Sequence, residues 1–188
     1  FELTAEASDP DGDDLTYCWE QYNTGPLAEL GNPVGNSPSF RSYPPVASPT
    51  RVFPRMHIIV INGSEEVEVL PTYTRNLKFR CSVRDNNPEI GGVAWEEVSF
   101  ETTAQAGPFR VTHPNNSIQW EVGAYTEVTW NVANTDGALV SCQKVNIKLS
   151  MDGGYNYPVT LAENIPNSGS YFVVVPDLVT GSARVRVE

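Results

Sequence analysis

The amino-acid sequence predicts an all-β chain, folded as two tandem antiparallel β-sandwiches. Apolar and polar residues alternate at a period of two through most of the chain, as in strands with one buried face. Val, Ile, Thr and aromatic residues dominate these runs, and Gly, Pro, Asn and Asp separate them. No segment carries a convincing helical period. Many short strands without helices predict sandwiches of the immunoglobulin-like or fibronectin-like kind.

The first half contains several predicted strands before a linker. Alternation runs through Phe1–Ala7, Leu15–Trp19, Leu77–Val83 and Val98–Phe100. The run Met56–Ile61 is short, apolar and rich in branched residues, so it predicts a buried strand. Small residues and a Gly-Pro step in Thr103–Phe109 indicate a linker between two domains, 1–105 and 106–188.

The second half repeats this style of alternation. Its predicted strands are Phe109–Val111, Val128–Val132, Val145–Leu149, the stretch YFVVVP that starts at Tyr171, and Ala183–Val187. Trp130 shares its face with apolar neighbours here, as Trp19 does in the first half, so both tryptophans are expected in cores.

A proline-rich insertion, residues 22–55, interrupts the first predicted sandwich. It carries seven prolines and almost no alternation. Loops of this length inside a compact domain are uncommon unless they are specialised. Arg41, Arg51 and Arg55 lie among aromatic residues in it, which predicts an ordered excursion across the sandwich.

Composition and charge exclude several classes of partner. Asp and Glu outnumber Lys and Arg by 23 to 12, giving a formal net charge of −11. Nucleic-acid binding needs a cationic face, which this chain has few residues to build. No apolar run approaches the roughly twenty residues needed to span a bilayer. Cys18 and Cys81 are expected on opposite strand faces, which disfavours a disulfide bond between them and predicts buried thiols. Folding is expected to require no cofactor at this chain length.

The acidic stretch SDPDGDDLTYCWEQ is the first candidate for a functional site. Asp9, Asp11 and Asp13 alternate in a segment where Pro10 and Gly12 favour a turn. A later strand ends near Asp85, and the same edge of a sandwich would hold both segments. Carboxylates gathered there suit calcium, so the set is a candidate calcium site, although a tight turn without an ion is the leading interpretation.

Other motifs give no catalytic residue. LSMDGGYNY contains the Asp-box pattern of hairpin turns, in which Asp152 binds backbone amides and the glycines take positive φ. No zinc-peptidase, nucleophile-elbow or phosphate-loop motif is present. Trp95, Trp120 and Tyr155 lie near turns and are candidate platform residues for a glycan or peptide ligand.

Several stretches together resemble a known arrangement. D-x-D-G-D-x-L-T-Y-x-W, with a later strand ending in V-x-D-N, resembles cadherin-like and polycystic-kidney-disease-type sandwich modules. FRSYPP followed by PTRVFP, LPTYTRNLKFRCSVRDN, GPFRVTHPN and IPNSGSYFVVVP are similar to the region after the catalytic domain of secreted bacterial reprolysin-type zinc metallopeptidases. The resemblance covers nearly the whole chain, and the proline-rich string is its most specific part.

This resemblance implies a non-catalytic accessory region in an extracellular or cell-surface protein. Its partner would be a protease domain upstream in the same polypeptide, and the opening at Phe1 within a strand pattern agrees with a longer parent. The chain would act as a spacer, an anchor or a substrate-orienting region. Two alternatives stay open at this stage, a glycan- or peptide-binding adhesion module and a calcium-rigidified stalk.

Overall fold

The computed structural model describes residues 1–188, and it confirms the predicted all-β fold. The chain forms two compact units, Phe1–Thr102 and Thr103–Glu188. They meet in sequence at the start of the segment expected to be a linker. The only helix has five residues and is too short to cross a membrane.

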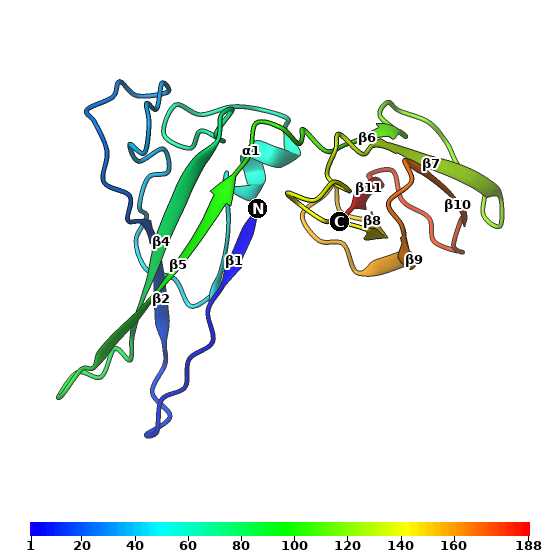
Figure 1. The fold of residues 1–188 in the computed structure, drawn as a ribbon. Helices are drawn as coiled ribbons and strands as arrows, with labels where there is room; N and C mark the ends of the chain where they lie inside the picture. The colour runs from blue at the N-terminus through cyan, green and yellow to red at the C-terminus, as the bar shows by residue number, and fades with distance from the viewer. The chain divides into compact units, whose positions relative to one another are not determined.

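The first unit contains two antiparallel sheets (Figure 1). One sheet pairs β1 (Glu2–Thr4) with β3 (Thr50–Val52), and the other has the order β2 (Thr16–Gln21), β4 (Arg75–Arg84), β5 (Val93–Thr102). The register of β4 places Trp19 opposite Cys81 and Val98 opposite Phe79. All of these side chains therefore lie on the same face of the sheet, toward β1 and β3.

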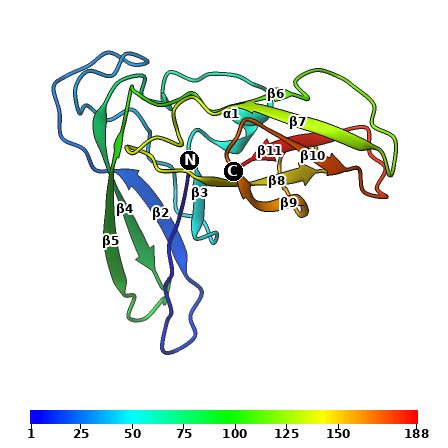
Figure 2. The same ribbon diagram turned by 45° about the vertical axis from the view of Figure 1, so that its right-hand side comes forward.

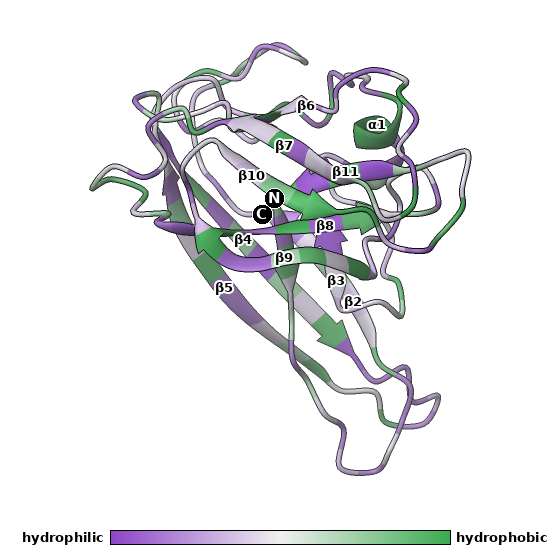
Figure 3. Cartoon of the chain, turned by 90° about the vertical axis from the view of Figure 1, so that its right-hand side faces the viewer, coloured by the Kyte–Doolittle hydropathy of each residue, from purple (hydrophilic) through white to green (hydrophobic).

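Aromatic residues fill the core of the first unit. Phe53 and Phe79 are fully buried, with ring centroids 4.8 Å apart, and Phe40 packs edge-on against Phe53 at 5.4 Å. Trp19 is buried and its indole Nε1 donates to the Pro49 carbonyl at 2.9 Å. Hydrophobic and hydrophilic residues alternate along β4 and along β5 from Glu97 to Glu101, so this part of the sheet has one face toward the core and one toward solvent (Figure 3).

The second unit also contains two antiparallel sheets, each with three strands. One has the order β10 (Ser170–Val174), β7 (Tyr125–Asn131), β6 (Arg110–His113), and the other β11 (Arg184–Val187), β8 (Lys144–Ser150), β9 (Val159–Pro166). Val128 and Ile147 are fully buried between them. Trp130 is buried as predicted, and its Nε1 donates to Asn167 Oδ1 at 2.7 Å.

The prediction of a strand at Met56–Ile61 is wrong, because Met56–Val60 forms helix α1. Backbone N–H groups of this segment donate within the turn, as from Ile61 to His57 at 3.3 Å. Only Ile58 is buried. A short apolar run does not distinguish a helix from a strand by period, and here no sheet edge pairs with it.

Three further differences separate the structure from the predicted strands. β3 and β9 were not predicted, since β3 has three residues within the insertion and β9 loses strict alternation at register shifts opposite β8. β1 ends at Thr4, although alternation continues to Ala7. All three thiols are free as predicted, but only Cys81 is buried, whereas Cys18 and Cys142 are half-buried.

Candidate functional site

The acidic stretch after β1 forms a tight turn, as the leading interpretation predicted. Asp9 Oδ1 accepts the backbone N–H groups of Asp11 at 2.9 Å and Asp13 at 3.1 Å. Gly12 has a φ of +81°, which glycine adopts without strain. Asp9 is therefore a structural acceptor that closes the turn on itself.

The loop after β4 meets this turn through its asparagines. Asn87 Nδ2 donates to Asp13 Oδ2 at 2.8 Å, and Asn86 Nδ2 donates to the Asp14 carbonyl at 2.8 Å. Asp85 instead accepts N–H groups from its own loop, including that of Gly92 at 2.7 Å. The acidic turn and the loop after β4 are therefore adjacent, as expected. Asp13 contributes to the hydrogen bonds that join them, whereas Asp85 does not.

No group of three or more His, Cys, Asp and Glu side chains in residues 1–188 is placed to hold a metal ion. The predicted calcium ligands Asp9, Asp11, Asp13 and Asp85 therefore do not form such a group. Calcium binding at this edge stays a prediction.

The Asp152 hairpin confirms the turn predicted for the second half. Asp152 Oδ1 accepts the N–H groups of Tyr155 at 3.1 Å and Asn156 at 3.0 Å, and the Ser150 hydroxyl donates to it at 2.8 Å. Gly153 and Gly154 have φ values of +82° and +101°. The hydrogen bonds from Asn156 and Ser150 lower the pKa of Asp152 from 3.8 to about 2.

The three aromatic candidates lie in different surroundings. Trp95, on the outer face of β5, is 58% exposed, and the Arg80 guanidinium lies 4.3 Å from its ring centroid. Trp120 packs against the core of the second unit, which disfavours it as a platform. Tyr155 is half-exposed at the Asp152 turn. Trp95 belongs to the first unit, whereas Trp120 and Tyr155 belong to the second.

A buried carboxylate that sequence reasoning missed holds the proline-rich insertion in place. The Glu68 side chain is fully buried, and it accepts hydrogen bonds from Arg51 Nη2 at 2.7 Å and from the Arg55 backbone N–H at 2.6 Å. Arg51 also donates to the carbonyls of Trp19 and Arg41, each at 2.6 Å. In the sequence, the signal for such a carboxylate was the presence of Arg51 and Arg55 among aromatic residues, because buried arginines require an acidic partner.

Aromatic stacking completes this cluster and confirms that the insertion is ordered. The Arg51 guanidinium lies 4.3 Å from the Phe53 ring centroid, and the Arg55 guanidinium lies 4.4 Å from the Tyr43 centroid. Arg55 also forms an ion pair with Glu65 at 2.7 Å, and this bond raises the pKa of Arg55. Cation–π contacts beside a buried carboxylate hold the insertion against the sandwich.

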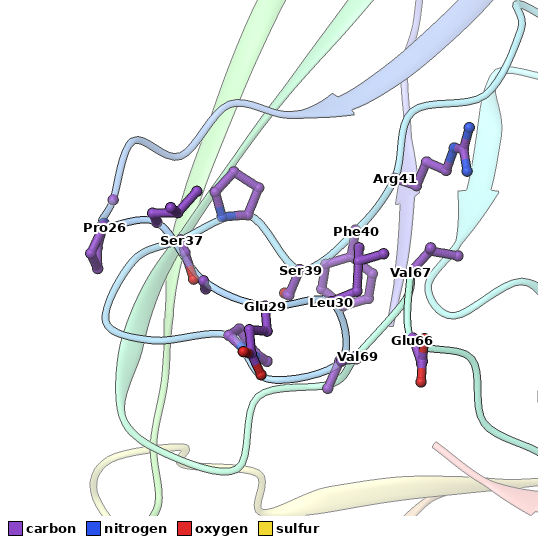
Figure 4. Close-up of a pocket in the computed structure, with 16 residues that line it drawn as sticks. Pro26, Glu29, Leu30, Ser37, Ser39, Phe40, Arg41, Glu66, Val67 and Val69 are labelled. Carbon is purple, nitrogen blue, oxygen red and sulfur yellow. The ribbon is translucent and has the colours of Figure 1, made fainter.

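A hollow of about 620 Å³ lies between the insertion and the segment that carries Glu68 (Figure 4). Residues 25–31 line one side, and Glu66, Val67 and Val69 line the other. Backbone bonds join the two sides, from Gly31 N–H to the Glu66 carbonyl at 3.0 Å and from Val69 N–H to the Ser39 carbonyl at 2.9 Å. The hollow is mainly apolar, so it suits an apolar side chain more than a reacting polar group.

Comparison with known proteins identifies no relative. No protein-family model, no curated protein and no solved structure matches this chain. Its function is therefore proposed from the sequence resemblance together with its own residues and contacts.

Proposed function

We propose that this chain is a non-catalytic pair of β-sandwich modules in a secreted or cell-surface bacterial zinc metallopeptidase. In this role it serves as a spacer, an anchor or a substrate-orienting region for a protease domain upstream in the same polypeptide. The observation that supports the proposal most is the fixed insertion. The proline-rich string with the most specific resemblance is also the segment held by the buried Glu68 and the stacked Arg51 and Arg55.

The use of the polar side chains also supports a structural role. Asp9, Asp85 and Asp152 each accept backbone N–H groups within their own loops. Such hydrogen bonds hold each loop in one conformation, as a spacer requires. They also occupy carboxylate oxygens that would otherwise be available for a reaction.

The exposed end of the insertion is the proposed contact with the protease domain. Leu27 is fully exposed and Leu30 is 70% exposed, both beside the hollow. Large apolar side chains grouped on a surface are typical of protein–protein contacts. The fixed backbone behind them lets this contact form without ordering a loop.

The proposal is tested by assaying the purified chain on casein and gelatin with added zinc. We expect no cleavage, and zinc-dependent cleavage would refute the non-catalytic role. The reading frame upstream of Phe1 gives a second test, since we expect it to encode H-E-x-x-H-x-x-G-x-x-H. A parent protein without any peptidase motif would contradict the proposed partner.

A glycan- or peptide-binding module is the second candidate, and the exposure of Trp95 favours it. The Arg80 guanidinium contacts two aromatic rings, since it is 3.8 Å from the Tyr22 centroid and 4.3 Å from that of Trp95. An exposed aromatic ring beside a cation can stack on a sugar or a peptide. Binding on a glycan array that is lost with Trp95→Ala, and retained with Trp120→Phe, would favour this candidate over the spacer.

A further inference from the structure

Strand β5 leaves one side of its backbone unpaired. It forms the edge of the sheet β2-β4-β5 and pairs with β4 along ten residues, Val93–Thr102 (Figure 2). In an antiparallel ladder, alternate residues direct their N–H and C=O groups away from the neighbouring strand. About half of the backbone groups of β5 are therefore open to a further strand.

An apolar groove of about 390 Å³ runs beside this edge. It lies between β5 and the segment Thr4–Ala7, and Trp19, Cys81 and Val98 from the core line it. On the other side of the groove, Ala5 packs against the core and Ala7 is exposed, and their short side chains fill little of the space beside β5. Side chains of an added strand have room to enter it.

The rim of the groove is acidic. Glu6 and Glu96 line it and neither forms an ion pair, whereas the third carboxylate, Glu97, is engaged by Lys78 at 2.6 Å and Arg80 at 2.7 Å. Residues 1–102 contain sixteen Asp and Glu against seven Lys and Arg. The groove therefore attracts a basic ligand, locally and through the field of the whole unit.

The same charges act against a second copy of this chain. Antiparallel pairing of two β5 strands centred on Glu96 brings the Glu96 carboxylate of one copy near that of the other. Like charges across neighbouring strands are destabilising, and acidic residues on an edge strand commonly prevent self-pairing. A partner strand with lysine or arginine at these positions has no such penalty.

We propose that the β5 edge and its groove bind an extended segment of another protein in which apolar residues and lysine or arginine lie on one face of the strand. The segment adds a strand to β5, places an apolar side chain against Trp19 and Val98, and sets a cation two residues away, on the same face, beside Glu96 and Glu6. Main-chain hydrogen bonds supply affinity in this mode, and alternate side chains supply specificity. This binding site is independent of the proposed accessory role.

The test uses the capped peptide Thr-Val-Thr-Lys-Thr-Val-Thr as the probe, because its valines and lysine lie on one face of a strand, and the same peptide with glutamate in place of lysine as its control. We expect calorimetric binding of the lysine peptide alone, together with slower amide hydrogen exchange in β5. The double variant Glu6→Gln/Glu96→Gln should weaken binding by about tenfold at low salt. The matched double variant Glu29→Gln/Glu66→Gln, which changes the net charge equally at the other hollow, should bind normally.

Three outcomes would overturn this proposal. Absence of binding removes the site, and equal weakening by the two double variants shows only general attraction to an acidic surface. Protection of β5 that appears without peptide and rises with protein concentration, alongside dimers in sedimentation, assigns the edge to a second copy.

Discussion

The Glu68 carboxylate shows how one residue can hold a long loop. Its side chain is fully buried, and both oxygens are used, one by Arg51 and the other by the Arg55 backbone. A buried ion pair adds little net stability compared with an apolar core, but the loss of one partner leaves the other charge buried and uncompensated. Glu68 is therefore important because its arginines are already in place.

The variant Glu68→Gln should destabilise the first unit by about 3–5 kcal/mol, because Arg51 would keep its buried charge without a counter-ion. Urea unfolding measured by tryptophan fluorescence checks the size of the effect. Glu66 provides the control because its side chain is exposed. The variant Glu66→Gln should change the free energy of unfolding by less than about 0.5 kcal/mol. Equal stability of the two variants would mean that Glu68 does not hold the insertion.

Asp152 contributes stability that depends on pH. Its pKa is about 2 in the folded chain against 3.8 ordinarily, so the folded state favours the charged form. This contribution is complete above about pH 4 and is lost as pH falls toward 2. The variant Asp152→Ala should therefore unfold at a lower temperature at pH 7, with the difference from wild type shrinking near pH 2. Thermal melts across this range test the prediction, and a difference independent of pH would contradict it.

At the scale of elements, the insertion behaves as a folded part of the sandwich although little of it is strand or helix. Gln21 Oε1 accepts the backbone N–H groups of Ser39 and Phe40, at 2.6 and 2.9 Å. The buried Arg75 donates to the Ser37 carbonyl at 2.7 Å. Side chains from β2 and β4 thus satisfy backbone groups that a regular element would pair with itself.

Close packing inside the insertion makes Gly25 sensitive to substitution. A β-carbon there would lie 2.3 Å from the Ser37 backbone nitrogen, so Gly25→Ala has to move the chain that Arg75 holds. We expect a loss of about 1–3 kcal/mol and faster tryptic cleavage after Arg51. Gly181→Ala is the control, because a β-carbon at that position would have no heavy atom within 4 Å. An unchanged cleavage rate in Gly25→Ala would contradict the ordered insertion.

At the scale of the whole molecule, each unit has its own buried cluster. Phe53, Phe79 and Leu77 belong to the first, and Val128 and Ile147 to the second. A unit with its own core is expected to fold alone. Fragments 1–102 and 103–188 should therefore each unfold cooperatively, and Glu68→Gln should lower the midpoint of the first fragment only. Circular dichroism melts of the two fragments check this, and a fragment without a cooperative transition would contradict it.

Strand alternation was predictable where a segment has one buried face. β4 is the clearest example, because Leu77, Phe79 and Cys81 face the core at every second position. The turns at Asp9 and Asp152 were predictable for a similar reason, since their side chains bond to nearby backbone. The surroundings of Trp120 were not predictable, because its exposure depends on packing against distant strands.

The sequence by itself determined the all-β class, the positions of the main strands and the tight turns, because each depends on residues close together in the chain. Only the tertiary structure decided that Met56–Val60 is a helix, that Glu68 meets Arg51 and Arg55, and that alanines leave a groove beside β5. These features depend on which distant segments share a core. A period-two pattern specifies the face of each side chain but not its neighbour across the sandwich.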